Sequence, residues 1–265
     1  MTKIAILGAA GRMGGALIRC CSRIPGIELA AAVDQPAHPM IGQDVGLLSG
    51  AGTVNVRLAG ALEAALAADV WIDFTFHAVV PHNVAAAARL GKALVVGTTG
   101  LDQAEAQTVR DAARAVPVVW TPNMSLGVNL LFALAEKAAA TLGVDYDAEI
   151  VETHHKYKKD APSGTALQLA ERVARGRAQK FDEVACYGRR GMAGERPRGQ
   201  IGIHAVRAGD VVGDHALSFS IEGERIELSH RATSRDAFAM GALRAASWVT
   251  AQKPGLYDMK DVLGL

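Results

Sequence analysis

The sequence has few aromatic residues, few cysteines and almost no net charge. Phe, Trp and Tyr make up 5% of its 265 residues, although 50% are hydrophobic. The interior must therefore consist mainly of Ala, Val, Leu and Ile, which suits alternating strands and helices. With 28 basic and 27 acidic residues, the formal net charge is +1. This balance argues against a surface for nucleic acid or for acidic lipids.

Cysteine usage and hydropathy also exclude several classes. The three cysteines are Cys20, Cys21 and Cys186, and no C-x-x-C pair occurs. We therefore expect buried, reduced thiols and neither a disulfide framework nor a zinc knuckle. The chain has no long apolar span, and an apolar strand begins at once at Lys3. We expect a cytoplasmic protein with no membrane segment.

A glycine-rich turn follows the first predicted strand, Lys3 to Leu7. The spacing Gly8-x-x-Gly11-x-x-Gly14 is a variant of the dinucleotide-binding fingerprint and precedes a predicted helix. Gly8 permits a tight turn, Gly11 lets a pyrophosphate approach the backbone, and Gly14 allows the helix to pack closely on the strand.

An acidic residue follows the second predicted strand at a suitable distance. Asp34 lies 20 residues after Gly14 and is placed to accept hydrogen bonds from the hydroxyls of an adenosine ribose. The alternative is a carboxylate that caps a turn. The neutral Gln35 beside it favours NAD, while the guanidinium of Arg12 leaves NADP open.

Three more apolar strands are predicted at 69–74, 92–97 and 116–120, each followed by a polar loop. Ala-rich helices separate them, so the order predicts a parallel, doubly wound Rossmann-type sheet. Ligands bind at the carboxyl ends of strands in such sheets. We therefore expect the loops after these strands to line the nicotinamide half of the cofactor.

The second half predicts a smaller α+β domain with a mixed or antiparallel sheet. A helix capped by Ser125 precedes a strand that ends at the two histidines, and antiparallel strands are expected at 200–207, 214–221 and 225–231. The last helix is expected to pack on the first domain. We assign 1–125 and 236–265 to a dinucleotide-binding domain and 126–235 to a substrate-binding and oligomerisation domain.

The most informative segment is 152–166, ETHHKYKKDAPSGTA. It places two histidines and three lysines before a Pro-Ser-Gly-Thr turn that opens a helix, and the free amides of a helix N-terminus bind anions. A small substrate carrying carboxylates would fit there, with a histidine as proton donor. The alternative is a solvated basic loop capped by Ser163 or Asp160. The small residues that follow, Gly164 and Thr165, favour a site.

A metal site is the weaker interpretation of the same segment. Its candidate ligands are Glu152, His154, His155 and Asp160. Consecutive histidines on a strand point to opposite faces and do not converge easily on one ion. The remaining histidines show no ligand spacing, so we expect no metal.

The glycine turn, GTTG at 97–100, TPNMS at 121–125 and the segment 152–166 together resemble the 4-hydroxy-tetrahydrodipicolinate reductase family. The likeness runs from end to end, and H-H-x-x-K-x-D-x-P-S-G-T is highly specific. It implies NADH- or NADPH-dependent reduction of a cyclic imine dicarboxylate to tetrahydrodipicolinate in lysine and diaminopimelate biosynthesis. It also implies a homotetramer assembled through the second-domain sheet.

The resemblance implies roles for individual residues. His154 would be the general acid/base, Lys158 a second proton-handling or carboxylate-binding group, and His155 a substrate contact. Gly164 and Thr165 would hold a carboxylate of the substrate. The implied cofactor contacts are Gly8, Ala9, Ala10, Gly11, Arg12, Met13, Asp34, Gly97, Thr98, Thr99, Thr121, Pro122, Asn123 and Met124.

Two positions depart from the family pattern. Many relatives carry an arginine where Gln35 stands, which bears on the use of NADPH, and Met124 replaces a commoner Phe. The sequence leaves open the ratio of NADH to NADPH use, and whether the substrate loses its hydroxyl on the enzyme or before binding.

Two other functions are alternatives. A homoserine-type dehydrogenase would share the nucleotide half but not the histidine–lysine segment. A redox-sensing, nucleotide-binding regulator would need a DNA-binding element, which neither the charge nor any helix-turn-helix segment supplies.

Overall fold

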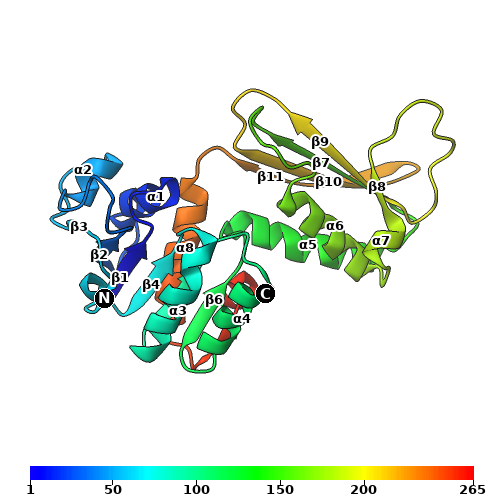
Figure 1. The fold of residues 1–265 in the computed structure, drawn as a ribbon. Helices are drawn as coiled ribbons and strands as arrows, with labels where there is room; N and C mark the ends of the chain where they lie inside the picture. The colour runs from blue at the N-terminus through cyan, green and yellow to red at the C-terminus, as the bar shows by residue number, and fades with distance from the viewer. The chain divides into compact units, whose positions relative to one another are not determined.

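A computed structural model describes residues 1–265, and the chain divides into two compact units (Figure 1). Unit 1 comprises residues 1–126 and 235–264, and unit 2 comprises residues 127–234. The chain therefore leaves unit 1 once and returns to it. The assignment of one unit to the dinucleotide and the other to the substrate stays a prediction.

Unit 1 contains a seven-stranded sheet in which every pair of neighbouring strands is parallel. The strand order is β12-β6-β5-β4-β1-β2-β3. The strands are β1 (Thr2–Leu7), β2 (Ile27–Val33), β3 (Leu58–Ala59), β4 (Val70–Asp73), β5 (Ala93–Val96), β6 (Pro117–Trp120) and β12 (Gly255–Tyr257). The order reverses beside β1, so the crevice at the carboxyl end of β1 is where such sheets bind ligands.

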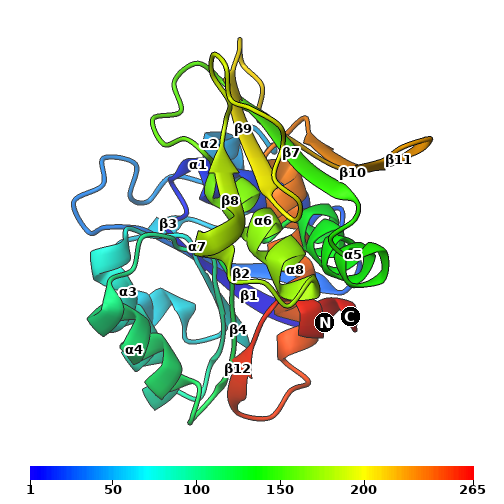
Figure 2. The same cartoon turned by 90° about the vertical axis from the view of Figure 1, so that its right-hand side faces the viewer.

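Helices cover both faces of this sheet (Figure 2). One face carries α1 (Arg12–Cys21), α8 (Asp236–Val249) and α9 (Met259–Leu263), and the other carries α3 (Val80–Arg89) and α4 (Gln103–Ala112). Strand β1 contributes to both cores, since Ile4 and Ile6 pack in one cluster and Ala5 and Leu7 in the other. The doubly wound Rossmann-type fold is thus confirmed.

Several short elements of unit 1 had no strong pattern in the sequence. They are α2 (Val45–Ser49), the 3₁₀ helices η1 (Leu62–Ala65) and η2 (His77–Val79), and the edge strands β3 and β12. Elements of two to five residues carry too few positions for a period to show. The last helix and the tail pack in unit 1, as expected.

Unit 2 is built on a mixed five-stranded sheet in the order β11-β10-β7-β9-β8. The strands are β7 (Asp147–His154), β8 (Ala185–Tyr187), β9 (Ile201–Arg207), β10 (Gly213–Ile221) and β11 (Glu224–Ala232), and the helices are α5 (Leu126–Leu142), α6 (Gly164–Gly176) and α7 (Phe181–Val184). The expected strands β9, β10 and β11 alternate in direction, and β10 pairs antiparallel with β11. However, β9 does not pair with β10, because β7 lies between them and β9 runs parallel to both β7 and β8. A long loop joins β8 to β9. Parallel neighbours need such a long connection, whereas antiparallel neighbours can be joined by a short hairpin turn.

Helices α5 and α6 pack on one face of this sheet. On β7 that face begins with the buried Ala148 and Ile150 and ends with the buried Glu152 and His154. The same strand face thus changes from apolar to polar toward its carboxyl end, because alternate residues of a strand share one face. This change places polar chemistry next to the start of α6.

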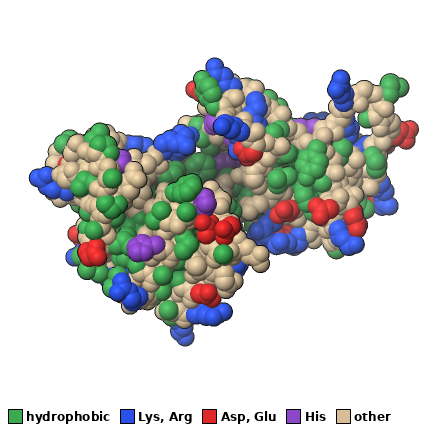
Figure 3. All heavy atoms as spheres, viewed as in Figure 1, with side chains coloured by type: hydrophobic (Ala, Val, Ile, Leu, Met, Phe, Trp, Pro, Cys, Tyr) green, Lys and Arg blue, Asp and Glu red, His purple; other side chains and the backbone are tan.

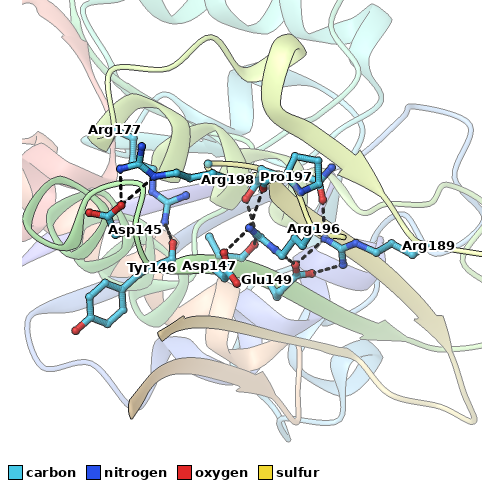
Figure 4. A network of polar contacts seen from close by, with 12 residues as sticks. Asp145, Tyr146, Asp147, Glu149, Arg177, Arg189, Arg196, Pro197 and Arg198 are labelled. Carbon is cyan, nitrogen blue, oxygen red and sulfur yellow. Dashed lines mark hydrogen bonds and ion pairs between the residues drawn. The ribbon is translucent and has the colours of Figure 1, made fainter. Parts of the chain in front are cut away.

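The opposite face of the sheet carries a surface cluster of charges. Arg189 and Arg196 converge on Glu149, and Arg196 also contacts Asp147 (Figure 4). Burial alone would raise the pKa of Glu149, but hydrogen bonds from Arg189, His204 and Arg196 outweigh it and lower the pKa to about 2. This carboxylate is therefore ionised near neutral pH.

Two further sequence expectations concern cysteines and membranes. Cys20 and Cys21 are buried as expected, whereas Cys186 is only partly buried, a correction that follows from its place on the short strand β8 near the sheet edge. No helix has both the length and the apolar character that a membrane span requires.

Candidate functional site

The glycine turn of unit 1 is shaped by positions where a side chain has no room. Gly8 has φ of +78°, and a Cβ there would lie 2.6 Å from the carbonyl oxygen of Phe74. A Cβ on Gly14 would lie 2.4 Å from the carbonyl oxygen of Gly8. Gly11 is the N-cap of α1 and no side chain caps that terminus. The backbone amides at the start of α1 are therefore approached without obstruction, as a pyrophosphate requires.

The side chain of Asp34 is hydrogen-bonded to this turn. One carboxylate oxygen accepts from the amide of Ala10 at 2.9 Å, and the other accepts from the amide of Gln35 at 2.8 Å. Each oxygen retains acceptor capacity for a hydroxyl donor. The residue that was expected to bind the ribose thus also fixes the conformation of the expected pyrophosphate loop.

A cavity of about 700 Å³ opens beside Asp34 in unit 1. Gly8, Asp34 and Gln35 line one part of it, and apolar groups that include Leu62, Leu66 and Val79 line another. Hydrophobic side chains gather on the face of unit 1 that Figure 3 presents. An apolar hollow next to the carboxylate that was expected to bind the ribose suits an adenine ring.

A second cavity of about 460 Å³ brings together most of the remaining cofactor candidates. Its lining includes Gly11, Arg12, Met13, Gly97, Thr98, Thr99, Pro122 and Met124, with Phe74, Thr75, Phe76, His77 and Phe238. Thr75 and Phe76 also line the first cavity, so both hollows border the loop after β4. Ala9 and Ala10 line a third hollow together with Arg12. Thr121 and Asn123 line none of the three.

A buried carboxylate that the sequence analysis did not single out holds these loops. Asp73, at the end of β4, is fully buried and accepts from the amide and hydroxyl of Thr75, the hydroxyl of Thr98 and the side-chain amide of Asn83. It therefore connects the loops after β4 and β5 with α3. Its partners lie up to 25 positions away, so no local pattern could have revealed it.

In unit 2, His154 is held by a buried glutamate. Nδ1 of His154 lies 2.5 Å from Oε2 of Glu152, and neither side chain is more than slightly exposed. Arg207 on β9 donates to both carboxylate oxygens, at 2.9 and 3.0 Å. Burial opposes ionisation of Glu152, but the hydrogen bonds from Arg207 and His154 outweigh it and lower the pKa. The imidazole thus has a charged acceptor at Nδ1.

The same glutamate reaches the start of α6. The amide of Ser163 donates to Oε1 of Glu152 at 3.0 Å, and the Ser163 hydroxyl caps α6 by accepting from the amide of Ala166. Of the two capping residues considered, Ser163 and Asp160, it is Ser163 that caps α6. Glu152 therefore connects the strand that carries His154 with the helix terminus that was expected to bind a carboxylate.

A second histidine lies against the first. His215 on β10 lies 3.1 Å from the Ser163 hydroxyl through Nε2, and its ring packs edge-on against His154 with centroids 5.1 Å apart. Burial lowers the pKa of His215 to about 4, and the charge of His154 adds to the shift. His215 is therefore a neutral neighbour of His154 near neutral pH.

The lysine segment lies between β7 and α6. Nζ of Lys158 is 2.9 Å from Asp160, whose pKa is lowered by that hydrogen bond from Lys158. His155 lies just past the end of β7, and its Nδ1 is buried without a hydrogen bond. Gly164 begins α6, and a Cβ there would meet no atom within 4 Å. Space for a ligand is thus present at the helix start, beside which Thr165 also lies.

The interpretation of 152–166 as a metal site gains nothing from the structure. No group of three or more His, Cys, Asp or Glu side chains is arranged to hold a metal ion. Glu152, which was weighed as a ligand, instead pairs with Arg207 and His154.

The residues around His154 differ in how far the sequence reveals them. Glu152 precedes His154 by two positions, so the period of a strand already placed both side chains on one face. Arg207 and His215 lie more than 50 positions away and carry no local signal. Only the pairing of β9 and β10 with β7 brings them to the site.

Comparisons with known proteins agree over the whole chain. The sequence models described as "Dihydrodipicolinate reductase, N-terminus" and "Dihydrodipicolinate reductase, C-terminus" match residues 2–124 and 127–263. A 4-hydroxy-tetrahydrodipicolinate reductase of Alkalilimnicola ehrlichii is 51% identical, covering 100% of this chain and 99% of the relative. One of Citrifermentans bemidjiense is 47% identical, covering 100% of both.

Solved structures give the same result. The dipicolinate-bound dihydrodipicolinate reductase from Paenisporosarcina sp. TG-14 aligns with a TM-score of 0.78 at 25% identity, covering 98% of this chain and 99% of that one. GenD2 from gentamicin A biosynthesis, solved with NAD, aligns with a TM-score of 0.63 at 15% identity, covering 99% and 90%. The second likeness shows the fold alone.

Proposed function

The chain belongs to the dihydrodipicolinate reductase family, and on that premise we propose that it reduces 4-hydroxy-tetrahydrodipicolinate to tetrahydrodipicolinate with NADH or NADPH. This reaction serves lysine and diaminopimelate biosynthesis. One observation carries the proposal in the structure: Glu152 joins a histidine to an approachable helix terminus within a single buried network. A proton donor beside an anion-binding terminus suits a dicarboxylate that must be protonated.

The residues of unit 1 fit a nicotinamide dinucleotide. Gly8 and Gly14 let the turn and α1 pack closely, no side chain caps α1 at Gly11, and Asp34 offers a carboxylate beside a cavity of about 700 Å³. The loops that include Gly97 and Pro122 line a second hollow, which shares Thr75 and Phe76 with the lining of the first. When bound there, the reduced nicotinamide supplies a hydride to the conjugated C=C–C=N system of the substrate.

The residues of unit 2 would handle the proton and the carboxylates. His154 has its Nδ1 held by Glu152, so Nε2 is the atom that would give the proton. The amide of Gly164 and the side chain of Thr165 would bind one carboxylate of the substrate, with His155 as a further contact. Lys158 would place a cation near the developing negative charge. Its present partner Asp160 is well exposed and would be exchanged for the substrate.

The proposal is tested by following the oxidation of NADH and of NADPH with substrate generated enzymically in the same cuvette. Consumption of reduced cofactor that depends on the substrate-generating enzyme is the expected result. A homoserine-type dehydrogenase would respond to its own substrate instead, and a regulator without turnover would consume no cofactor.

We also propose a homotetramer assembled through the sheet of unit 2. The face of that sheet opposite α5 and α6 is not covered by any helix, and Val151 and Val206 on it are 43% and 42% exposed. Light scattering coupled to size exclusion should give four times the chain mass of 27.7 kDa. A cytoplasmic location and a small-molecule substrate, without a nucleic-acid or membrane partner, belong to the same proposal.

A further inference from the structure

We propose that Glu152 is a positioning residue, which fixes the imidazole of His154 with its proton on Nδ1 and holds the start of α6 in the same bond network. The inference rests on the proposed function, because it assigns the group that prepares His154 for that reaction. Glu152 itself would touch neither substrate nor cofactor.

The two carboxylate oxygens divide their partners between strand and helix. Oε2 accepts from Nδ1 of His154 at 2.5 Å and from Arg207 at 2.9 Å. Oε1 accepts from the amide of Ser163 and from Arg207, both at 3.0 Å. All four partners are donors, so the acceptor-only carboxylate satisfies each of them at once. A neutral amide at this position would turn an N–H group toward one of these donors in either orientation.

Arg207 makes an ionised carboxylate tolerable in a buried position. The Glu152 side chain is completely buried, and a buried charge is costly unless it is paired and hydrogen-bonded. The guanidinium of Arg207 meets both oxygens and also donates to the carbonyl oxygen of Asp160. Arg207 therefore ties the loop that carries Lys158 to the same carboxylate.

The neighbours of the imidazole leave Nε2 as its reactive atom. In the sheet, His154 pairs with Arg207 on one side, and Gly213 begins the strand on the other. A Cβ on Gly213 would lie 3.0 Å from Nε2, so glycine keeps that edge of the ring clear. His215 packs against the ring but is held by the Ser163 hydroxyl. The charged and titratable groups around His154 are thus Glu152, Arg207, His215 and the pair Lys158–Asp160.

The tautomer is tested directly on the intact, wild-type protein. In the ¹⁵N-histidine-labelled chain without substrate, long-range ¹H–¹⁵N correlations at alkaline pH should show His154 protonated at Nδ1 and unprotonated at Nε2. The signals are assigned by their loss in His154→Gln. A ring protonated at Nε2, or one averaging between both tautomers, overturns the proposal without any variant of Glu152 and without any assay.

Kinetics of Glu152→Gln provide the second test. Loss of an orienting partner typically costs 10- to 100-fold, so we expect kcat to fall by roughly that factor while the dissociation constant for NADH stays the same. Because the protonated imidazole loses its anionic neighbour, the alkaline limb of the kcat profile should move to lower pH. Glu152→Asp, which keeps the charge, should recover part of the rate.

Glu149→Gln is the matched control. Glu149 lies on the same strand but on the opposite face, and it also pairs with a histidine and two arginines. Because this face is also the proposed assembly surface, size exclusion first establishes that the variant has the wild-type assembly state. Its kcat and pH profile should then be unchanged. A Glu152→Gln enzyme with the wild-type rate and pH profile overturns the inference while the proposed function stands. A wild type without substrate-dependent cofactor oxidation refutes the proposed function, whereas the NMR result still reports on the tautomer.

Discussion

At the scale of single residues, His215 shows how a buried side chain makes stability depend on pH. Burial lowers its pKa to about 4 in the folded chain, from 6.5 when exposed. Between these values the unfolded chain binds a proton that the folded chain does not. The contribution of His215 to the free energy of unfolding is therefore complete above about pH 6.5 and is lost as the pH falls toward 4.

This linkage predicts a specific change in His215→Gln, which can still accept a hydrogen bond from Ser163. Wild type should lose up to about 3 kcal/mol more unfolding free energy than the variant between pH 6.5 and pH 4. Urea unfolding at a series of pH values measures the difference. If the plots of unfolding free energy against pH were parallel for the two proteins, His215 would be protonated equally in the folded and unfolded chains, which contradicts the prediction.

Gln35 is the residue on which cofactor choice is expected to depend. It follows Asp34 in the lining of the first cavity, and a neutral amide there offers no charge to a 2′-phosphate. A guanidinium binds phosphate with two parallel hydrogen bonds. We expect Gln35→Arg to raise the ratio of kcat/KM for NADPH to that for NADH by about tenfold or more.

The control for this prediction is Gln35→Met, which has a similar length and no charge. Side-by-side kinetics with both cofactors should leave its ratio close to that of wild type. An unchanged ratio in Gln35→Arg would place the 2′-phosphate elsewhere, with Arg12 of the glycine turn as the alternative.

At the scale of elements, the carboxylate of Asp73 joins three segments that line the second cavity or support it. It binds Thr75 after β4, Thr98 after β5 and Asn83 on α3. In Asp73→Asn, the new amide would oppose one of these donors, so the loops should lose their fixed positions. The KM for NADH should rise roughly tenfold, because binding then requires ordering of the loops.

Asp69→Asn is the control for this variant. Asp69 immediately precedes the other end of β4, and its carboxylate accepts from the amide of Lys3. Steady-state kinetics should show no change in KM for this control. Equal KM values for Asp73→Asn and wild type would mean that packing alone holds the loops.

The elements also show where sequence information ends. Long periodic segments such as 125–143 and the apolar strands of unit 1 were predicted, because hydrophobic periodicity reports burial directly. The neighbours of β9 were not predicted, since alternation along a strand does not say which strands it pairs with. The glycine turn and 152–166 could be recognised because their residues are contiguous in the sequence.

At the scale of the whole molecule, each unit supplies one half of the proposed chemistry. Unit 1 offers the turn, the carboxylate and the cavities suited to a hydride carrier. Unit 2 offers His154, the opening of α6 and the network around Glu152. Asp73, Arg207 and His215 were missed because their roles depend on strand pairing or on distant loops. A single sequence does not show such contacts locally.

Because the two units have different proposed roles, we expect mutations in unit 2 to lower turnover without weakening the binding of NADH. His154→Gln and Lys158→Ala should each lower kcat by on the order of a hundredfold or more, as for loss of a general acid or of a charge that binds the substrate. Neither should change the affinity for NADH, because both residues lie in unit 2. Fluorescence titration with NADH supplies that comparison.

The most direct test of the account is substrate-dependent oxidation of NADH by wild type and by His154→Gln under identical conditions. The account predicts rapid oxidation by wild type and a rate about a hundredfold lower in a variant that folds and binds NADH normally. Equal rates in the two proteins would contradict the role of His154, and no oxidation by wild type would contradict the proposed reaction itself.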